Sequence, residues 1–166
     1  MKKKPKYFIL DVDGVLTDGK FIYSDKGKKY KVFGPHDHDG LKIIKDLINI
    51  EFITADKNGY SITKRRIVND MKFKLSLVSE KVRINYIEKK FGLKNIIYMG
   101  DSIFDAEILK KSLYGIAPKN SRIEARQSAD FITESNSGEG AVLDACLRIK
   151  NKFFKKWKKL YQLPFQ

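Results

Sequence analysis

Short apolar runs of strand length recur along this chain, separated by segments whose apolar residues have helical spacing. Strands are predicted at residues 6–11, 51–54, 75–78, 95–99, 114–117 and 130–133. Helices are predicted at residues 39–48 (with Asp39 as the N-cap), 60–71, 80–91, 103–111, 121–128 and about 140–162. Strand–helix–strand units place successive strands parallel in one sheet, with the helices against its faces. The sequence therefore predicts an α/β fold, a Rossmann-like parallel sheet flanked by helices.

One segment interrupts this alternation directly after the first strand. Residues 20–33 alternate weakly between apolar and polar side chains around a turn signal at residues 24–27. This pattern predicts a β-hairpin flap at about residues 19–34. No internal repeat and no low-complexity linker divides the chain, so we expect a single domain over residues 1–166.

Polar side chains stand at the ends of three predicted strands. Asp11 and Asp13 follow the first strand, Thr54 ends a second, and Asp101 follows a third. The carboxyl ends of parallel strands share one edge of the sheet, where such folds bind their ligands. A carboxylate taken out of water needs a cation or dense hydrogen bonding. We therefore interpret this edge as an active site.

Phosphoryl transfer is a reaction that these groups suit. Asp11 is a candidate nucleophile, and Asp13 can protonate the leaving oxygen and later deprotonate a water molecule. Asp101 would help to hold Mg²⁺, which prefers oxygen ligands and neutralises the charge of a phosphate. Thr54 offers a hydroxyl group and a backbone N–H, and Lys81 lies at a helix start that favours an anion.

Four segments together resemble, in order, the motifs of the haloacid dehalogenase-like (HAD) phosphatases. They are DVDGVLTDG at residues 11–19, Thr54, Lys81, and GDSIFD at residues 100–105. The long first motif, the hairpin and GEGA at residues 138–141 resemble one subgroup of that family. This subgroup comprises the 3-deoxy-D-manno-octulosonate (Kdo) 8-phosphate phosphatases and their sialic-acid-type 9-phosphate relatives. The resemblance covers about residues 6–150.

The resemblance implies a Mg²⁺-dependent phosphatase without a cap domain, which works through a phosphoaspartate. It also implies a homotetramer in which a neighbour helps to close each site. Residue by residue, it makes Asp11 the nucleophile and Asp13 the acid/base, with both binding the metal together with Asp101. It places the phosphoryl group at Thr54, Ala55 and Lys81, with support from Ser102 and Asp105.

The sequence departs from the subgroup where the sugar is expected to bind. Asp56 stands two residues after Thr54, where the Kdo enzymes usually have arginine. Further candidates for substrate contacts are His36, His38, Arg65 and Arg66. The substrate stays open at this point between Kdo 8-phosphate, a nonulosonate 9-phosphate and another phosphorylated sugar.

A net charge of +14 keeps a non-enzymatic alternative open. A basic surface and the aromatic, lysine-rich tail at residues 150–159 would bind anions in that case, although packing of the tail is the simpler reading. HAD chemistry other than phosphate hydrolysis is a third reading. No apolar run approaches the roughly 18 residues of a membrane span. The lysines are dispersed apart from the two termini, so a solvated basic surface is the simpler reading, and we expect neither nucleic acid nor membrane as a partner. The single cysteine, Cys146, excludes an intrachain disulfide, and we expect a cytoplasmic protein.

Overall fold

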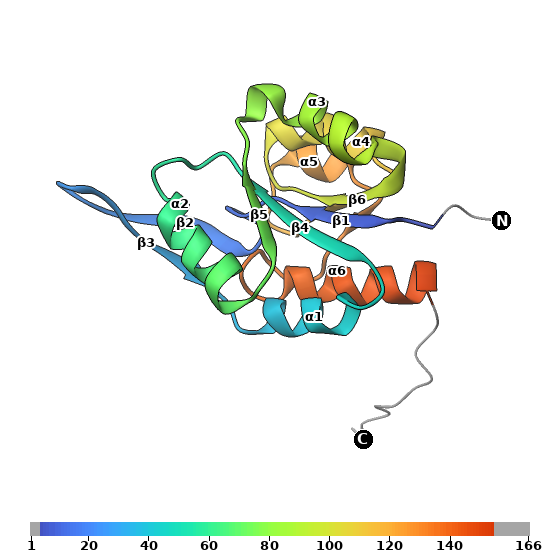
Figure 1. Cartoon of the computed structure of the whole chain (residues 1–166), viewed down its shortest axis with the longest axis horizontal. Helices are drawn as coiled ribbons and strands as arrows, with labels where there is room; N and C mark the ends of the chain where they lie inside the picture. Colours follow the sequence, from blue (N-terminus) through green and yellow to red (C-terminus); the bar gives the residue numbers. More distant parts are fainter. Residues whose placement is uncertain (1–3, 155–166) are drawn as a thin grey trace, which may run out of the picture.

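A computed structural model of the protein describes residues 4–154 and shows a parallel sheet between two layers of helices (Figure 1). The six strands of this sheet run in the order β5-β4-β1-β6-β7-β8, and every neighbouring pair is parallel. Their bounds are β1 Tyr7–Leu10, β4 Asn49–Thr54, β5 Lys74–Leu77, β6 Ile96–Met99, β7 Tyr114–Ala117 and β8 Phe131–Ile132. The predicted α/β fold with a parallel sheet is confirmed.

The central strand is apolar throughout because helices cover both faces of the sheet. Phe8 and Leu10 pack into the cluster on the side of α1 (His36–Ile44) and α6 (Ala141–Ile149). Ile9 points to the opposite cluster, beside residues of α3 (Glu80–Phe91), α4 (Ala106–Lys111) and α5 (Ile123–Ser128). Figure 1 shows these two groups of helices on opposite sides of the strands. This burial holds β1 rigid, and the loop that carries Asp11 and Asp13 starts at its end.

Some predicted helices differ in detail from those observed. The segment predicted at 60–71 consists of α2 (Tyr60–Lys64) followed by a π-helical segment, Arg65–Asp70. The segment predicted at 103–111 begins with a 3₁₀ turn, Ile103–Asp105, and another 3₁₀ turn, Leu93–Asn95, precedes β6. The closing helix α6 continues into a π-helical segment, Lys150–Phe154, and the remainder of the predicted helix lies outside the described residues.

The start of α1 corrects one prediction. The helix begins at His36, three residues before the expected start, and Asp39 is not its cap but an exposed residue that pairs with Lys42 at 3.1 Å. Asp37 is fully buried instead, and its carboxylate accepts a hydrogen bond from the backbone N–H of Val142 at the start of α6. This contact joins segments 105 residues apart, so local sequence does not reveal it.

The predicted hairpin is present and stands apart from the main sheet. It consists of β2 (Thr17–Ser24) and β3 (Gly27–Phe33), which pair antiparallel and project from the body of the molecule (Figure 1). Its outer part exposes apolar side chains, each at least 40% accessible: Phe21, Ile22, Tyr23, Tyr30 and Val32. Within residues 4–154, the hairpin comes directly after β1 and before α1.

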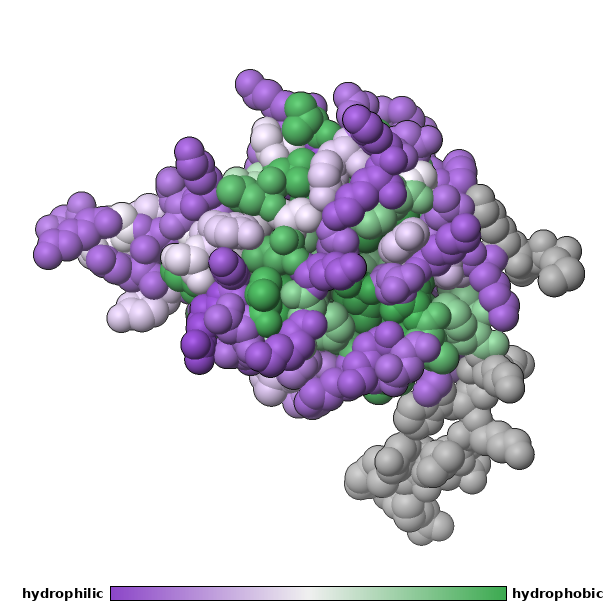
Figure 2. All heavy atoms as spheres, viewed as in Figure 1, coloured by the Kyte–Doolittle hydropathy of each residue, from purple (hydrophilic) through white to green (hydrophobic). Residues whose placement is uncertain are grey.

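The rest of the surface is mostly hydrophilic in the view of Figure 2, with apolar residues near the middle of that face. Across the described residues, none of the helices combines the length and the apolar character that crossing a membrane requires. One domain over residues 1–166 stays a prediction, because the terminal residues lie outside the described part.

Candidate active site

A cavity of about 460 Å³ lies at the carboxyl ends of the central strands. It is lined by the loops after β1, β4 and β6, the start of α3 and the hairpin. The lining residues are Asp11, Asp13, Gly14, Gly19, Phe21, Lys28, Thr54, Ala55, Asp56, Glu80, Arg83, Asp101, Ser102 and Phe104. The structure thus brings the predicted aspartates and Thr54 to one cavity, as expected for strand ends in a parallel sheet.

Three carboxylates of this region form a compact acidic cluster. Oxygen atoms of Asp11, Asp101 and Asp105 lie within 4.8 Å of one another. Burial raises the pKa of Asp11 well above its usual value, and Asp105 and Asp101 raise it further. Burial and the charge of Asp105 likewise raise the pKa of Asp101 to about 7. Clustered hard oxygen donors fit a divalent cation such as Mg²⁺, which would offset the repulsion between the carboxylates and favour the ionised forms of Asp11 and Asp101.

Gly14 allows this cluster to form next to the first motif. Its backbone has φ +81°, and a Cβ atom there would collide with the Asp101 carboxylate. Only glycine adopts this conformation without cost and leaves room for Asp101 beside the loop.

Arg83 supplies the positive charge at the buried end of the cavity. Its Nη1 atom lies 3.3 Å from Oδ1 of Asp11 and 3.0 Å from Oδ1 of Asp105, and its side chain is only 3% exposed. Burial lowers the pKa of Arg83, but Asp11, Tyr98 and Asp105 outweigh that effect and raise it above its usual value. Arg83 therefore stays positively charged beside Asp11, the candidate nucleophile.

Lys81, the residue expected at this place, is not brought to the cavity. It lies on the exposed side of α3 and is not among the lining residues. Residues two apart on a helix point in different directions, whereas Arg83 shares its buried face with Ile87, four residues later. Arg83, Ile87 and Phe91 recur at every fourth position and form the buried face of α3. This spacing is the sequence signal that would have placed Arg83, and not Lys81, on the buried side.

Asp105 binds and orients Arg83. It is fully buried, and its Oδ1 accepts hydrogen bonds from Arg83 and from the Tyr98 hydroxyl at 2.5 Å. Its Oδ2 accepts the Ser102 hydroxyl at 2.7 Å and the backbone N–H groups of Asp101 and Ser102. Ser102 and Asp105 thus form a capping box that holds the Asp101 loop. The role of Tyr98 was not apparent from the sequence, where it is simply part of an apolar strand.

Asp13 has a different environment from Asp11 although both lie on the same cavity. Its Oδ2 is 2.8 Å from Nζ of Lys31, and its Oδ1 is 3.5 Å from the Thr17 hydroxyl. The two aspartates of the first motif therefore face different cations, Arg83 for Asp11 and Lys31 for Asp13. Different environments for paired carboxylates are typical of sites that give them different roles.

The loop after β4 brings Thr54, Ala55 and Asp56 to the cavity. The Thr54 hydroxyl accepts the backbone N–H of Asp56, which shapes this turn. Asp56 pairs with Lys28 at 2.5 Å and with Lys31 at 2.7 Å. Burial raises the pKa of Asp56, but the hydrogen bonds from Lys28 and Lys31 lower it to about 2. The acid that replaces the expected arginine is thus neutralised by two hairpin lysines, which sequence reasoning missed.

The other substrate candidates lie away from this cavity in the described chain. His36 is exposed, and His38 packs edge-on against Phe73. Arg65 is exposed and pairs with Asp70, and neither Arg65 nor Arg66 lines the cavity.

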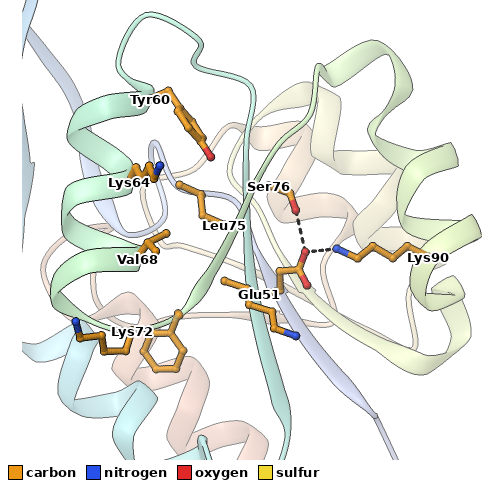
Figure 3. A pocket seen from close by; sticks show the side chains of 10 residues that line it. Glu51, Tyr60, Lys64, Val68, Lys72, Leu75, Ser76 and Lys90 are labelled. Atoms are coloured by element: carbon orange, nitrogen blue, oxygen red, sulfur yellow. Dashed lines mark hydrogen bonds and ion pairs between the residues drawn. The ribbon is translucent and has the colours of Figure 1, made fainter.

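A second cavity, of about 610 Å³, lies beside the edge strand β5 and lacks these groups. Figure 3 shows side chains from α2, the adjoining π-helical segment, the strands and α3 around it. Its acid, Glu51, already accepts hydrogen bonds from Ser76 and Lys90. We therefore assign the chemistry to the cavity with the aspartates.

Fold and site together define a class of protein. The chain matches the haloacid dehalogenase-like hydrolase family over residues 23–145 and belongs to that family. The predicted family resemblance is confirmed.

Individual relatives point to one subgroup. The chain is 26% identical to the 3-deoxy-D-manno-octulosonate 8-phosphate phosphatase of Salmonella typhi over 151 residues, or 85% of this chain and 77% of the relative. The structure of the enzyme of that name from Moraxella catarrhalis, in complex with magnesium, phosphate and Kdo, superposes with a TM-score of 0.76 at 28% identity, covering 89% of this chain and 86% of that one. The structure of a probable YrbI family phosphatase from Pseudomonas syringae superposes with a TM-score of 0.79 at 28% identity. The match covers 90% of this chain and 87% of that one.

The raised pKa of Asp101 predicts a pH dependence of stability in metal-free buffer. A folded-state pKa of about 7, above the usual 3.8, means that Asp101 supports the fold when protonated. This contribution is complete below about pH 4 and is lost as the pH rises through about 7. Asp101→Asn cannot ionise at this position. The melting temperature of this variant minus that of the wild type should therefore increase from pH 5 to pH 8. Scanning fluorimetry in chelator measures this, with the exposed Asp39→Asn as control. A pH-independent difference would contradict the prediction.

The different positions of Arg83 and Lys81 predict a clear contrast in activity. Arg83→Met should lower kcat/KM for phosphate ester hydrolysis by roughly 100-fold or more, because it removes a buried charge beside Asp11. Lys81→Met should stay within about twofold of the wild type, since exposed side chains away from a site contribute little. Circular dichroism checks that both variants fold. A larger loss for Lys81→Met would show that the relevant cation is on the other side of α3.

Proposed function

We propose that this protein is a Mg²⁺-dependent phosphomonoesterase that acts on a small phosphorylated sugar or sugar acid through an aspartyl-phosphate intermediate. The observation that carries the proposal is the setting of Asp11. It lies at the end of the central strand, beside Arg83 and the acidic cluster, with Asp13 on the same cavity. The Salmonella typhi and Moraxella catarrhalis relatives are named as Kdo 8-phosphate phosphatases, which supports the substrate class.

In the first step, an oxygen of Asp11 forms a bond to phosphorus while the bond from phosphorus to the sugar oxygen breaks. Asp13 gives its proton to that leaving oxygen. Arg83 balances the charge at Asp11, and Thr54 with the backbone N–H of Ala55 holds the phosphoryl oxygens. In the second step, water attacks phosphorus and Asp13 takes a proton from it. The bond from phosphorus to the Asp11 oxygen breaks, which frees the Asp11 carboxylate and inorganic phosphate.

Asp11, Asp101 and the Asp13 carbonyl would hold Mg²⁺, which supplies charge neutralisation and alignment of the phosphoryl group when bound. Arg83 and Asp105 keep Asp11 in place before any ligand arrives. The substrate beyond the phosphate meets the part of the cavity formed by Phe21, Lys28 and Asp56. These groups suit the hydroxyl and carboxylate groups of a Kdo 8-phosphate or nonulosonate 9-phosphate type of substrate.

Substitution of Asp11 tests the covalent mechanism. Asp11→Ala and Asp11→Asn should lower kcat by roughly a thousandfold or more, because the nucleophile is lost. Phosphate release is measured on p-nitrophenyl phosphate, Kdo 8-phosphate, N-acetylneuraminate 9-phosphate and glucose 6-phosphate, with Mg²⁺ and with chelator. Activity of the wild type should require Mg²⁺. Full activity of both variants, or of the wild type in chelator, would contradict the proposal.

We also propose a homotetramer in the cytoplasm, assembled through the exposed outer part of the hairpin. Its exposed apolar side chains gather on a segment that projects from the body of the molecule, as expected of an interface. Light scattering should give four times the mass of one chain for the wild type. The double variant Ile22→Asp, Tyr30→Asp should give a smaller species, whereas Lys26→Asp at the turn should not. A monomeric wild type would contradict the assembly.

A further inference from the structure

Lys31 on β3 is the most completely buried cation of the cavity region. Its side chain is 0% exposed, and its Nζ atom lies 2.8 Å from Asp13 and 2.7 Å from Asp56. The Thr63 hydroxyl accepts a third hydrogen bond from Nζ at 2.9 Å. An ammonium group has three N–H donors, so this set of partners uses all of them. An ammonium group is costly to bury unless it is paired, and Asp13 and Asp56 supply this pairing for Lys31.

The hairpin also inverts the usual pattern of a strand. Lys31 points inward, while its neighbours Tyr30 and Val32 are 65% and 48% exposed. Alternation along a strand sends successive side chains to opposite faces. The inward face of the hairpin therefore presents a charge, and not an apolar side chain, to the loops that carry Asp13 and Asp56.

Asp13 depends on this charge for its orientation. Besides Lys31, the side-chain contact it makes in the described structure is the 3.5 Å hydrogen bond from Thr17, which is long. Asp13 and Asp56 both pair with the Nζ atom of Lys31, and Asp56 also pairs with Lys28, so without Lys31 the Asp13 carboxylate would lose its cation and face the Asp56 carboxylate. Such a pair would repel, and the Asp13 carboxyl would turn away.

We propose that Lys31 is a positioning residue of the phosphatase reaction, which holds the Asp13 carboxyl where it can protonate the leaving oxygen. This inference rests on the proposed function. Lys31 does not touch the reacting atoms and acts through Asp13. As the phosphorus–oxygen bond to the sugar breaks, the proton of Asp13 passes to the departing oxygen, and the attacking water later returns it.

Leaving groups of different basicity separate this role from a structural one. A sugar alkoxide is strongly basic and leaves with the help of a general acid, whereas p-nitrophenolate leaves without a proton. A displaced Asp13 should therefore slow hydrolysis of a sugar phosphate far more than that of p-nitrophenyl phosphate. General damage to the fold would lower both rates together.

The test compares Lys31→Met with Lys29→Met, an exposed lysine of the same strand. The value measured is kcat/KM, which covers formation of the aspartyl phosphate, for p-nitrophenyl phosphate and for whichever of the three sugar phosphates the wild type hydrolyses fastest. Lys31→Met should lose roughly 100-fold or more on the sugar phosphate and threefold or less on p-nitrophenyl phosphate. Asp13→Asn should show the same selectivity, and Lys29→Met should change neither value by more than about twofold.

A second pair of variants guards against misfolding, because Lys31→Met leaves two partly buried carboxylate charges with one cation fewer: Asp13 loses its partner and Asp56 keeps only Lys28. Lys31→Met combined with Asp56→Asn removes one of those charges, and it should keep the selective loss relative to Asp56→Asn alone. If the wild type is active and Lys31→Met loses equally on both substrates, or loses nothing, the role of Lys31 would be overturned while the proposed function stands. A wild type that hydrolyses neither substrate would overturn the proposed function, and this inference with it.

Discussion

The balance of buried charge around Arg83 is the interaction on which the site depends. Three carboxylates gather at the ends of two adjacent strands, and burial raises the pKa of two of them, Asp11 and Asp101. Arg83 bridges Asp11 and Asp105, and Asp105 in turn anchors the loop of Asp101. Because every member of this network is held by another, the candidate nucleophile is oriented before substrate binds.

The hairpin contributes a second set of charges from outside the Rossmann-like body. Lys28 and Lys31 reach over the cavity and neutralise Asp56, while Lys31 also binds Asp13. The two aspartates of the first motif are therefore held by different parts of the structure. The core holds Asp11 through α3, and the hairpin holds Asp13. This division agrees with the different tasks proposed for them, attack and proton transfer.

Much of the fold was predictable because its signals are local. Apolar runs of strand length, helical spacing and the turn at 24–27 each depend on neighbouring residues, and they identified the sheet and the hairpin. The ordered motifs identified the family. Predictions failed to locate contacts where the choice lay between similar residues close in sequence: Arg83 lies in the cavity and Lys81 does not, and Asp37 is buried in place of Asp39. Which side of a helix is buried depends on what packs against it.

The sequence by itself determined the family and the edge of the sheet that carries the site, because the motifs occur in the family's order and aspartates at the end of a buried strand need a cation or dense hydrogen bonding. It also determined that Thr54 and Asp101 share an edge with them, since parallel strands end together. Only the tertiary structure decided which cations meet these acids. Arg83, Lys28 and Lys31 come from a helix face and a hairpin whose approach depends on packing across the whole chain. Charge pairing over such distances in sequence leaves no local pattern, and so only the folded chain shows it.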